Sequence, residues 1–350
     1  MSLKGTRMKR TAFILVILLT LATVGSTLAD QHVETVATFD AAAGEFPEGI
    51  ASDRQGNLYV SLAPLGQIWK IAPGGDRSLF ATLVDPSELP LPLGALGVAV
   101  DAHGDVYAAL ASFDPDTHGV WRIDQDDSPP ERLAGSEAIM LPNGLAFGRH
   151  HDLYVTDSLL GAVWRLTPGQ PAQLWLQHDL LTGTSVPELE LPIGVNGIAF
   201  LHGNRGKANW PRGASWTSSA GALYVANTTE KHVVRIPIDK QGNPGNPKVV
   251  VAFDGPADYL DGIVVDVHGN LYPVIIGRST LVRVSRDGAI TTLATAEDGL
   301  DFPASLTFGR GASRELFITN FAVFPSPDPQ RPGPGVVRVD IGDGSRLTQH

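Results

Sequence analysis

The sequence predicts an all-β fold, a six-bladed β-propeller with four antiparallel strands in each blade. Three observations support this prediction: a short pattern recurs six times, turn-forming residues are frequent, and charged residues are sparse. Glycine and proline account for 38 and 26 of the 350 residues, and charged residues for 18%. This composition excludes a coiled coil and a charged, disordered chain. Many short strands between turns are typical of closed β-architectures.

The repeat joins a glycine-led apolar segment to a strand with a central aromatic residue. The first copy reads Glu48-Gly-Ile-Ala and then Asn57-Leu-Tyr-Val, and the third reads Asn143-Gly-Leu-Ala and then Asp152-Leu-Tyr-Val. The spacing between successive copies, 43 to 65 residues, suits one four-stranded blade per copy. The copies begin at Glu48, Leu96, Asn143, Asn196, Asp261 and Ala304.

A third strand follows in each copy and carries one cation between apolar residues, as in Trp69-Lys70-Ile71. This alternation puts the cation on the polar face of a half-buried strand. We therefore expect these cations to face solvent or a neighbouring blade, although a ring of six cations is also the pattern of an anion site. The six are Lys70, Arg122, Arg165, Arg235, Arg283 and Arg338.

A fourth strand is visible in most copies, for example at 78–83 and 248–253. The last copy has no recognisable fourth strand of its own. The segment 33–39, Val-Glu-Thr-Val-Ala-Thr-Phe, resembles the fourth strands and stands before the first blade. We predict that it completes blade six and closes the ring, because closure leaves only short strand edges unpaired.

The N-terminal 29 residues are predicted to be a secretory signal peptide, so that residues 30–350 form one propeller domain. Four cations precede the apolar run 11–24, and Thr27-Leu28-Ala29 is a small-residue cleavage site. The alternative is a retained N-terminal anchor. The cations are Lys4, Arg7, Lys9 and Arg10. We expect an exported protein, periplasmic or extracellular, without stable membrane insertion after cleavage.

Charge and cysteine content narrow the function classes. The formal net charge is −11, so the chain has no basic excess to neutralise phosphates, and we expect no nucleic-acid partner. The sequence contains no cysteine, which excludes disulfides, thiolate metal sites and a cysteine nucleophile.

The residue before each repeated glycine is the candidate for a metal site. In a propeller the first strand of every blade lines the central channel, so these six residues project toward one point. Four of them are oxygen donors, namely Glu48, Asn143, Asn196 and Asp261. Two carboxylates and two amides form a hard oxygen site that suits Ca²⁺ better than Zn²⁺ or copper. The alternative for each Asn-Gly or Asp-Gly pair is an ordinary turn.

Blade three carries the most specific motif. Asn143-Gly-Leu-Ala-Phe and Leu153-Tyr-Val-Thr-Asp-Ser158 fit the pattern Asn-Gly-Leu…Tyr-x-x-Asp-Ser. On these residues, and on the Glu48-Gly pair, the chain resembles the superfamily of senescence marker protein (regucalcin), gluconolactonase and luciferin-regenerating enzyme. Its relatives include paraoxonase and diisopropyl fluorophosphatase. The resemblance implies a calcium-dependent hydrolase of lactones, esters or phosphoesters.

Blade two departs from the sugar lactonases of that superfamily, which carry Arg-x-Asn-Asp-Gly where this chain has Gly94-Ala95-Leu96-Gly97. This difference favours a small apolar lactone or ester as the substrate. The ligand order instead resembles paraoxonase and diisopropyl fluorophosphatase, in which the blade-five aspartate is the general base or nucleophile. The resemblance therefore points to Asp261 as the catalytic residue. The alternatives are that Asp261 only holds the ion, or that the protein is a non-catalytic ligand- or protein-binding propeller with a structural calcium.

Other residues are expected at the same mouth of the channel. We expect His118 to be an exposed loop histidine, and Asp157, Asn227 and Asn320 to cap turns beside the site rather than bind the ion. The loop 320–335 contains Phe321 and Phe324, and it is either an apolar cover or an ordinary surface loop. The insertion 201–221 is expected on the opposite face.

Overall fold

The computed structural model describes residues 33–89, 93–126, 128–186, 191–203, 221–309, 314–324 and 330–342. By internal contacts, all of these residues belong to one compact unit. The expected signal peptide and most of the insertion, residues 204–220, lie outside the described residues. Within the described ranges, no helix has the length and apolar character needed to cross a membrane.

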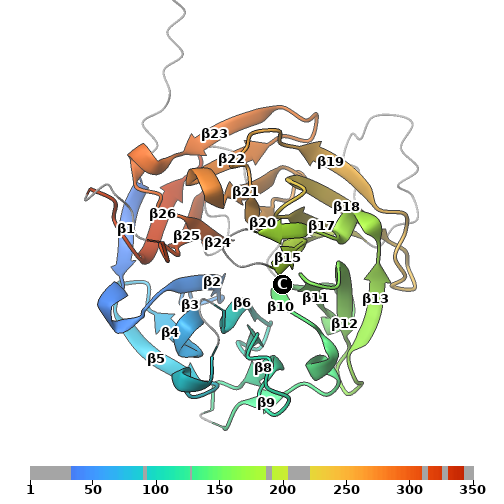
Figure 1. The fold of residues 1–350 in the computed structure, drawn as a ribbon, viewed down its shortest axis with the longest axis horizontal. Helices are drawn as coiled ribbons and strands as arrows, with labels where there is room; N and C mark the ends of the chain where they lie inside the picture. The colour runs from blue at the N-terminus through green and yellow to red at the C-terminus, as the bar shows by residue number, and fades with distance from the viewer. Residues whose placement is uncertain are drawn as a thin grey trace, which may run out of the picture. The chain divides into compact units, whose positions relative to one another are not determined.

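The predicted six-bladed propeller is confirmed, with six four-stranded antiparallel sheets around a central channel (Figure 1). Blade one contains β2 (Pro47–Ser52), β3 (Leu58–Leu62), β4 (Gln67–Ile71) and β5 (Arg77–Thr82). Blade two contains β6 (Ala95–Val100), β7 (Val106–Leu110), β8 (Gly119–Ile123) and β9 (Glu131–Arg132). Blade three contains β10 (Pro142–Phe147), β11 (Leu153–Asp157), β12 (Ala162–Leu166) and β13 (Gln173–Gln177).

Blade four contains β16 (Val195–His202), β17 (Gly221–Asn227), β18 (His232–Ile238) and β19 (Lys248–Ala252). Blade five contains β20 (Leu260–Val265), β21 (Leu271–Ile275), β22 (Thr280–Val284) and β23 (Ile290–Ala294). Blade six contains β24 (Pro303–Phe308), β25 (Glu315–Asn320), β26 (Gly335–Asp340) and β1 (Val33–Thr38). A small hairpin of β14 (Thr184–Val186) and β15 (Leu191–Ile193) precedes blade four. Single turns of 3-10 helix lie at Ala41–Ala43, Ala63–Leu65, Pro86–Glu88, Ser136–Ala138, Arg149–His151, Asp179–Leu181, Ile276–Arg278 and Ala296–Asp298.

The N-terminal strand closes the ring, as predicted. Strand β1 pairs antiparallel with β26, with Val33 opposite Val339 and Thr38 opposite Gly335. In Figure 1 the blue β1 therefore lies beside the red β26 at the outer edge of blade six. This pairing joins the two ends of the propeller by backbone hydrogen bonds and gives blade six its fourth strand.

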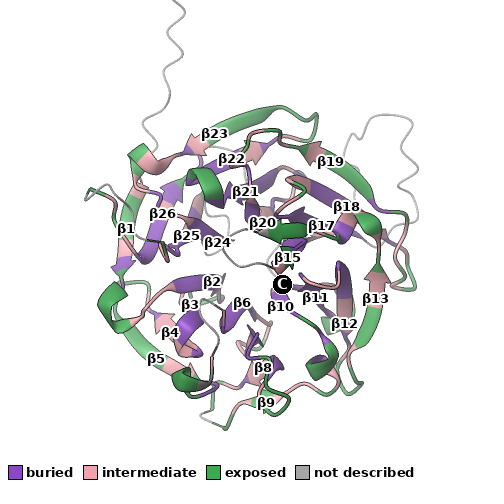
Figure 2. Cartoon of the chain, in the orientation of Figure 1, coloured by how far each residue is buried: buried purple, intermediate pink, exposed green. Residues whose placement is uncertain are grey.

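Burial falls from the channel to the rim of each blade (Figure 2). All five residues of β3 are buried, whereas the outer β5 has only exposed and half-exposed positions. The aromatic residue of the second strand packs between blades: Tyr59, Tyr154 and Tyr272 are almost wholly buried. The core consists of the apolar layers between successive blades, so each blade is stabilised by its neighbours.

The turn between the first two strands of a blade is organised by an aspartate. Asp53 Oδ1 accepts the backbone N–H groups of Gln55 (2.8 Å) and Asn57 (2.9 Å), and its Oδ2 accepts from Asn57 Nδ2 (2.7 Å). Asp266 makes the equivalent bonds in blade five. The glycine in this turn adopts positive φ, 89° at Gly56, which explains its recurrence there.

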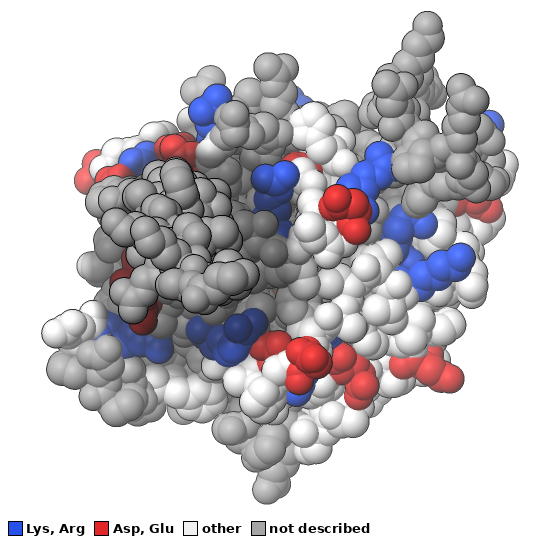
Figure 3. Space-filling view, turned by 90° about the horizontal axis from the view of Figure 1, so that it is seen from above, with Lys and Arg blue, Asp and Glu red and all other residues white. Residues whose placement is uncertain are grey.

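Two of the third-strand cations form ion pairs at half-exposed positions, as the alternation along the strand predicts. Arg122 forms ion pairs with Asp105 (2.7 Å) and Asp124 (2.9 Å), and Arg338 pairs with Glu34 and Glu315. These are half-exposed pairs at strand edges, away from the channel axis. On the outer edge drawn in Figure 3, acidic and basic side chains lie interspersed over the visible described surface.

Every first strand contains a bulge at the repeated motif. In blade one the pairing of β2 with β3 shifts between Pro47 and Ile50, which leaves Glu48 and Gly49 as the irregular pair. The same shift occurs at the start of β6, β10, β16, β20 and β24. A bulge re-aims a side chain that regular pleating would direct elsewhere. Six bulges in register therefore turn six side chains toward the channel.

The repeated glycines are required by close contact between blades. A Cβ atom at Gly144 would lie 2.5 Å from the backbone oxygen of Asn196, and one at Gly197 would lie 2.5 Å from that of Asp261. The same distance is 2.4 Å at Gly49, 2.2 Å at Gly97 and 2.7 Å at Gly262. Because the motif lies in a strand bulge, the alternative of an Asn-Gly or Asp-Gly turn is wrong.

A methyl group at this contact should destabilise the fold. We expect Gly144→Ala to lower the free energy of unfolding by about 2 kcal/mol, because the neighbouring atom is backbone and has little freedom to move. Gly74→Ala is the matched control, since a Cβ there meets no atom within 4 Å. Thermal unfolding of both variants checks this, and equal melting temperatures would contradict the contact.

Candidate metal centre

The four side chains predicted to bind a metal line one cavity at the mouth of the channel. The cavity has a volume of about 380 Å³, and Glu48, Asn143, Asn196 and Asp261 all contribute to its surface. Each is the second residue of a first strand, on β2, β10, β16 and β20. Their exposed fractions are only 7–8%. The bulges of four different blades therefore bring these oxygen donors to one buried place.

The two carboxylates of this cluster are poorly stabilised as anions. Burial raises the pKa of Glu48 to about 8. Burial and then the charge of Glu48 raise the pKa of Asp261 well above its usual range, while hydrogen bonding from Asn196 lowers it. A carboxylate is normally ionised at neutral pH, so this arrangement favours either a bound cation or a retained proton.

The two amides are oriented by hydroxyl groups behind them. Asn143 Nδ2 donates to Ser158 Oγ (3.2 Å), and Asn196 Nδ2 donates to Thr228 Oγ1 (3.3 Å). Ser158 Oγ in turn donates to the backbone oxygen of Val195 (2.5 Å). Both amide nitrogens thus donate to hydroxyl groups, and Asn196 also donates to Asp261. A cation would be bound by the carbonyl oxygens Oδ1, because these are the acceptor atoms of an amide.

A second set of hydroxyls links the candidate ligands to the neighbouring blades. Thr156 Oγ1 accepts the N–H of Gly144 (2.8 Å) and donates to the backbone oxygen of Asn196 (2.6 Å). Equivalent bonds join Ser61 to Gly49 and Leu96, and Thr319 to Ser305 and Glu48. Sequence reasoning missed this role, although a hydroxyl two residues after the aromatic residue of the second strand in blades one, three and six was its signal.

The donor set fits a hard divalent cation. It combines two anionic carboxylates with two neutral amide oxygens, the ligand types that Ca²⁺ prefers. No group of three or more His, Cys, Asp or Glu side chains is placed to hold a metal in the described part of the chain. The present cluster contains only two such residues, Glu48 and Asp261, because the other two are asparagines. Binding by these four side chains stays a prediction that their chemistry supports.

The rest of the cavity wall is apolar and largely aromatic. Tyr259, Phe302, Phe321 and Phe324 come from the loops of blades five and six. Phe302 meets Phe324 edge to face with ring centroids 5.1 Å apart. The remaining apolar lining residues are Leu93, Leu96, Leu141, Ile193, Ala257, Ile276 and Val323. The described parts of loop 320–335 thus contribute an apolar wall beside the carboxylates.

The polar residues after the second strands anchor loops and are not among the cavity residues. Asp157 accepts the backbone N–H groups of Met140 (2.8 Å) and Leu141 (3.1 Å). Asn227 makes hydrogen bonds to the backbone of the loop that leads into β16, the first strand of its blade. Asn320 does the same in the loop that leads into β24. These contacts agree with the predicted capping role.

His118 is buried, so the prediction of an exposed loop histidine was wrong. Its Nε2 lies 2.7 Å from the backbone oxygen of Ile139, and its Nδ1 accepts the N–H of Phe113 (3.0 Å). Burial lowers its pKa, so it is the neutral ring that bridges these two loops. Phe113 itself has a φ of 59°, a local conformation that sequence periodicity does not reveal.

Hollows at the other end of the channel lack a comparable acidic pair. One of about 260 Å³ contains Asp53 and Asp101. Both carboxylates are already used by turn amides: Asp101 Oδ1 accepts the N–H groups of His103 (2.8 Å) and Asp105 (3.0 Å), as Asp53 does in its own turn. The buried cluster around Glu48 and Asp261 is therefore the stronger candidate.

Comparison with known proteins agrees with the fold and with the family resemblance. Residues 201–322 match the SMP-30/gluconolactonase/LRE-like region. This confirms the resemblance predicted from the motifs. No curated protein sequence matches the chain.

Three solved structures illustrate the shared fold. A calcium-binding protein, regucalcin, from Agrobacterium tumefaciens superposes with a TM-score of 0.63 at 15% identity, over 91% of this chain and 98% of that chain. A gluconolactonase from Xanthomonas campestris gives 0.59 at 20% identity, over 89% and 90%. A luciferin-regenerating enzyme gives 0.61 at 17% identity, over 91% and 97%. At these identities the likeness shows the propeller fold.

The carboxylate pair predicts a pH-dependent effect of chelation. Without a cation, the raised pKa values mean that the folded state binds more protons than the unfolded state from about pH 4.5 to pH 8. Stability then falls as pH rises through this range. Calcium favours the ionised carboxylates, so the melting temperature gained on adding calcium to chelated protein should be larger at pH 8 than at pH 5.

Scanning calorimetry at both pH values measures this effect. The double variant Glu48→Gln/Asp261→Asn is the control, and it should lose both the calcium response and its pH dependence. A calcium response that is equal at both pH values, or that survives in the double variant, would place the ion elsewhere.

Proposed function

We propose that the protein is a calcium-dependent hydrolase of small apolar lactones or esters. The observation that carries this proposal is the juxtaposition of two buried carboxylates and two oriented amides with an apolar cavity wall. The match to the SMP-30/gluconolactonase/LRE-like region and the gluconolactonase and regucalcin folds support a lactonase-type hydrolase or a calcium-binding propeller.

Glu48, Asn143, Asn196 and Asp261 would hold the cation through side-chain oxygens. When bound, calcium supplies a Lewis acid that polarises a carbonyl or phosphoryl oxygen. Ser158 and Thr228 engage the amide nitrogens of Asn143 and Asn196, so the carbonyl oxygens Oδ1 are the atoms that would bind the ion. The hydroxyl-to-backbone bonds of Thr156 and Thr319 hold the strands that carry Asn196 and Glu48.

Asp261 is the residue we assign to proton transfer. One carboxylate oxygen of Asp261 accepts a proton from the attacking water, whose oxygen then adds to the substrate carbonyl carbon. The ester bond breaks and the proton passes to the leaving alkoxide, so a lactone opens to its hydroxy acid. No histidine lines the cavity within the described ranges, and His118 is engaged between two loops, so a carboxylate is the remaining base.

The cavity wall favours an apolar substrate over a sugar lactone. Leu93 and Leu96 from blade two face the same cavity as the aromatic residues of blades five and six. A polyhydroxylated ring would leave its hydroxyl groups without partners against such a surface, at a cost of about 1–3 kcal/mol for each buried group. A volume of about 380 Å³ accommodates a small lactone or ester.

The second candidate function is a non-catalytic propeller that binds a ligand or a protein and uses calcium only for stability. The full engagement of His118 favours it, because the cavity then depends on one carboxylate for its chemistry. Asp261 would in that case act as a ligand and nothing more.

The N-terminal sequence supports a further part of the proposal, export to the periplasm or the exterior. Four cations, an apolar run and a small-residue cleavage site precede the propeller. Mass spectrometry of the protein from its native host should find a chain that begins at Asp30.

Asp261→Asn separates the catalytic role from the ligand role, because the amide keeps an oxygen donor and loses the base. We expect kcat for a responsive lactone or aryl ester to fall by at least about 100-fold. Calcium affinity, measured by titration calorimetry, should fall far less. Glu45→Gln is the control, since its carboxylate pairs with Arg77 at the surface. A near wild-type rate would make Asp261 a ligand only.

The wild-type protein itself tests the proposed activity. A screen of lactones, aryl esters and phosphotriesters at saturating calcium should find at least one substrate whose hydrolysis stops on chelation. If none is hydrolysed although calcium binds, the second candidate function is the correct one.

A further inference from the structure

Three residues with strained backbone conformations lie in the loops of blades five and six that border the cavity. Ser279, Phe302 and Ala322 have φ values of 49°, 50° and 44°. They are three of the seven non-glycine residues with positive φ in the described part of the chain. Such conformations persist only where surrounding contacts enforce them, and they concentrate at functional sites. Two of the three, Ser279 and Phe302, belong to one hydrogen-bond network that includes Arg331.

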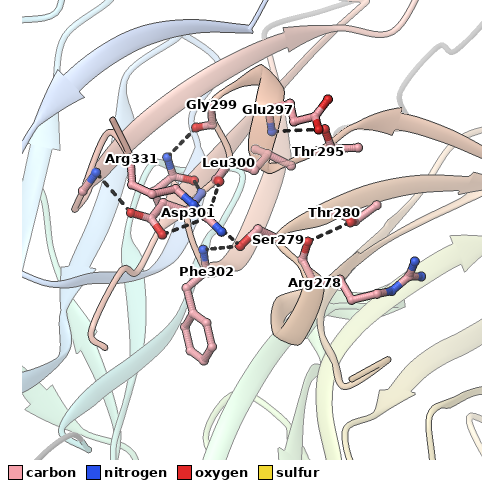
Figure 4. Close-up of polar contacts among 12 residues, drawn as sticks. Arg278, Ser279, Thr280, Thr295, Glu297, Gly299, Leu300, Asp301, Phe302 and Arg331 are labelled. Atoms are coloured by element: carbon pink, nitrogen blue, oxygen red, sulfur yellow. Dashed lines mark hydrogen bonds and ion pairs between the residues drawn. The ribbon is translucent and has the colours of Figure 1, made fainter. Parts of the chain in front are cut away.

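Arg331 bridges three groups of blades five and six (Figure 4). Its Nη1 donates to Ser279 Oγ (3.0 Å), to the backbone oxygen of Leu300 (2.9 Å) and to Asp301 Oδ1 (3.1 Å). The Asp301 side chain is only 9% exposed, and its Oδ2 accepts the N–H of Gly333 (3.2 Å). The guanidinium therefore neutralises a buried carboxylate and ties it to the loop that precedes β26.

The same network determines the backbone conformation of Phe302. Ser279 Oγ, which Arg331 holds, accepts the N–H of Phe302 (2.9 Å). The backbone oxygen of Phe302 accepts the N–H of Phe321 (3.1 Å). Asp301 is fixed from its other side, because its N–H donates to Asn320 Oδ1 (3.0 Å). The N–H and the backbone oxygen of the strained residue are thus both engaged, by Ser279 and by Phe321.

The side chain of Phe302 points away from this polar network (Figure 4) and lines the cavity. It packs edge to face on Phe324, and its centroid lies 6.5 Å from that of Phe321. These three rings form the aromatic wall. The position of the wall relative to Asp261 therefore depends on the φ of Phe302, and that φ depends on the bonds through Ser279 and Asp301.

We propose that Arg331 is a positioning residue that determines how the cavity accepts the apolar part of its substrate. This inference rests on the proposed function and adds a specificity determinant outside the cavity. Without the guanidinium, Asp301 is a buried carboxylate without its cation and Ser279 Oγ loses a donor. Phe302 then relaxes toward negative φ, and its ring leaves the wall. Substrates with a long apolar chain lose contacts that a minimal lactone never makes.

Steady-state kinetics with γ-butyrolactone and γ-decalactone test this role. In Arg331→Ala we expect KM for γ-decalactone to rise by about tenfold, the size of a lost apolar contact, while kcat changes less. The ratio of kcat/KM between the long and the short lactone should fall accordingly. Arg331→Lys keeps the charge beside Asp301 and should restore part of that ratio. Arg122→Ala is the control, because it removes a comparable Arg–Asp pair on blade two, away from this corner.

Binding of γ-decanolactam, the amide analogue of γ-decalactone, separates failure of this inference from failure of the proposed function. Calorimetry should show weaker lactam binding in Arg331→Ala than in the wild type, whether or not any lactone is hydrolysed. Equal lactam binding and an unchanged ratio in a folded Arg331→Ala variant would overturn the inference. A general loss of stability would appear as equal effects on both lactones and no rescue by lysine, and that outcome also contradicts a positioning role.

Discussion

Around the channel, the backbone of each blade from one to five lies so close to the next that no side chain fits between them. A Cβ atom at Gly97 would sit 2.2 Å from the backbone oxygen of Asn143, and the distance is at most 2.7 Å at the other four glycines. These contacts fix how far each blade stands from the axis. Because the residue before each glycine lies in a strand bulge, the same constraint also determines where its side chain points. The cluster of Glu48, Asn143, Asn196 and Asp261 is therefore a consequence of blade packing.

That geometry buries two carboxylates close together, which disfavours their ionised forms. Two carboxylates of about 8% exposure have raised pKa values, and Asn196 donates a hydrogen bond to Asp261. Either a divalent cation or a retained proton relieves the repulsion between the two carboxylates. On the other side of the cavity, the aromatic wall excludes water from part of the site. The cluster of oxygen donors beside an apolar wall is the arrangement expected for a hydrolase of apolar lactones or esters.

Most of the fold was predictable from the sequence because every blade repeats the same contacts. The strand order, the closure by 33–39 and the four converging oxygen donors all follow from the register of six copies. The meaning of the glycines was harder to predict, since an Asn-Gly pair alone does not distinguish a turn from a contact with the next blade. The hydroxyl of Thr156 was missed for the same reason, because its partner Asn196 is 40 residues away. Loop features without periodicity, such as the burial of His118 and the role of Arg331, were beyond sequence reasoning.

The central claim is that one hard cation binds where four blades converge. Anomalous diffraction from a crystal soaked in terbium, a calcium substitute, tests it most directly. We predict one strong peak at the channel mouth with an oxygen of Glu48, Asn143, Asn196 and Asp261 each within about 2.3–2.6 Å, the range of calcium–oxygen bonds. A peak bound by other residues, or an ordered crystal with no peak at this mouth, would contradict this cation site.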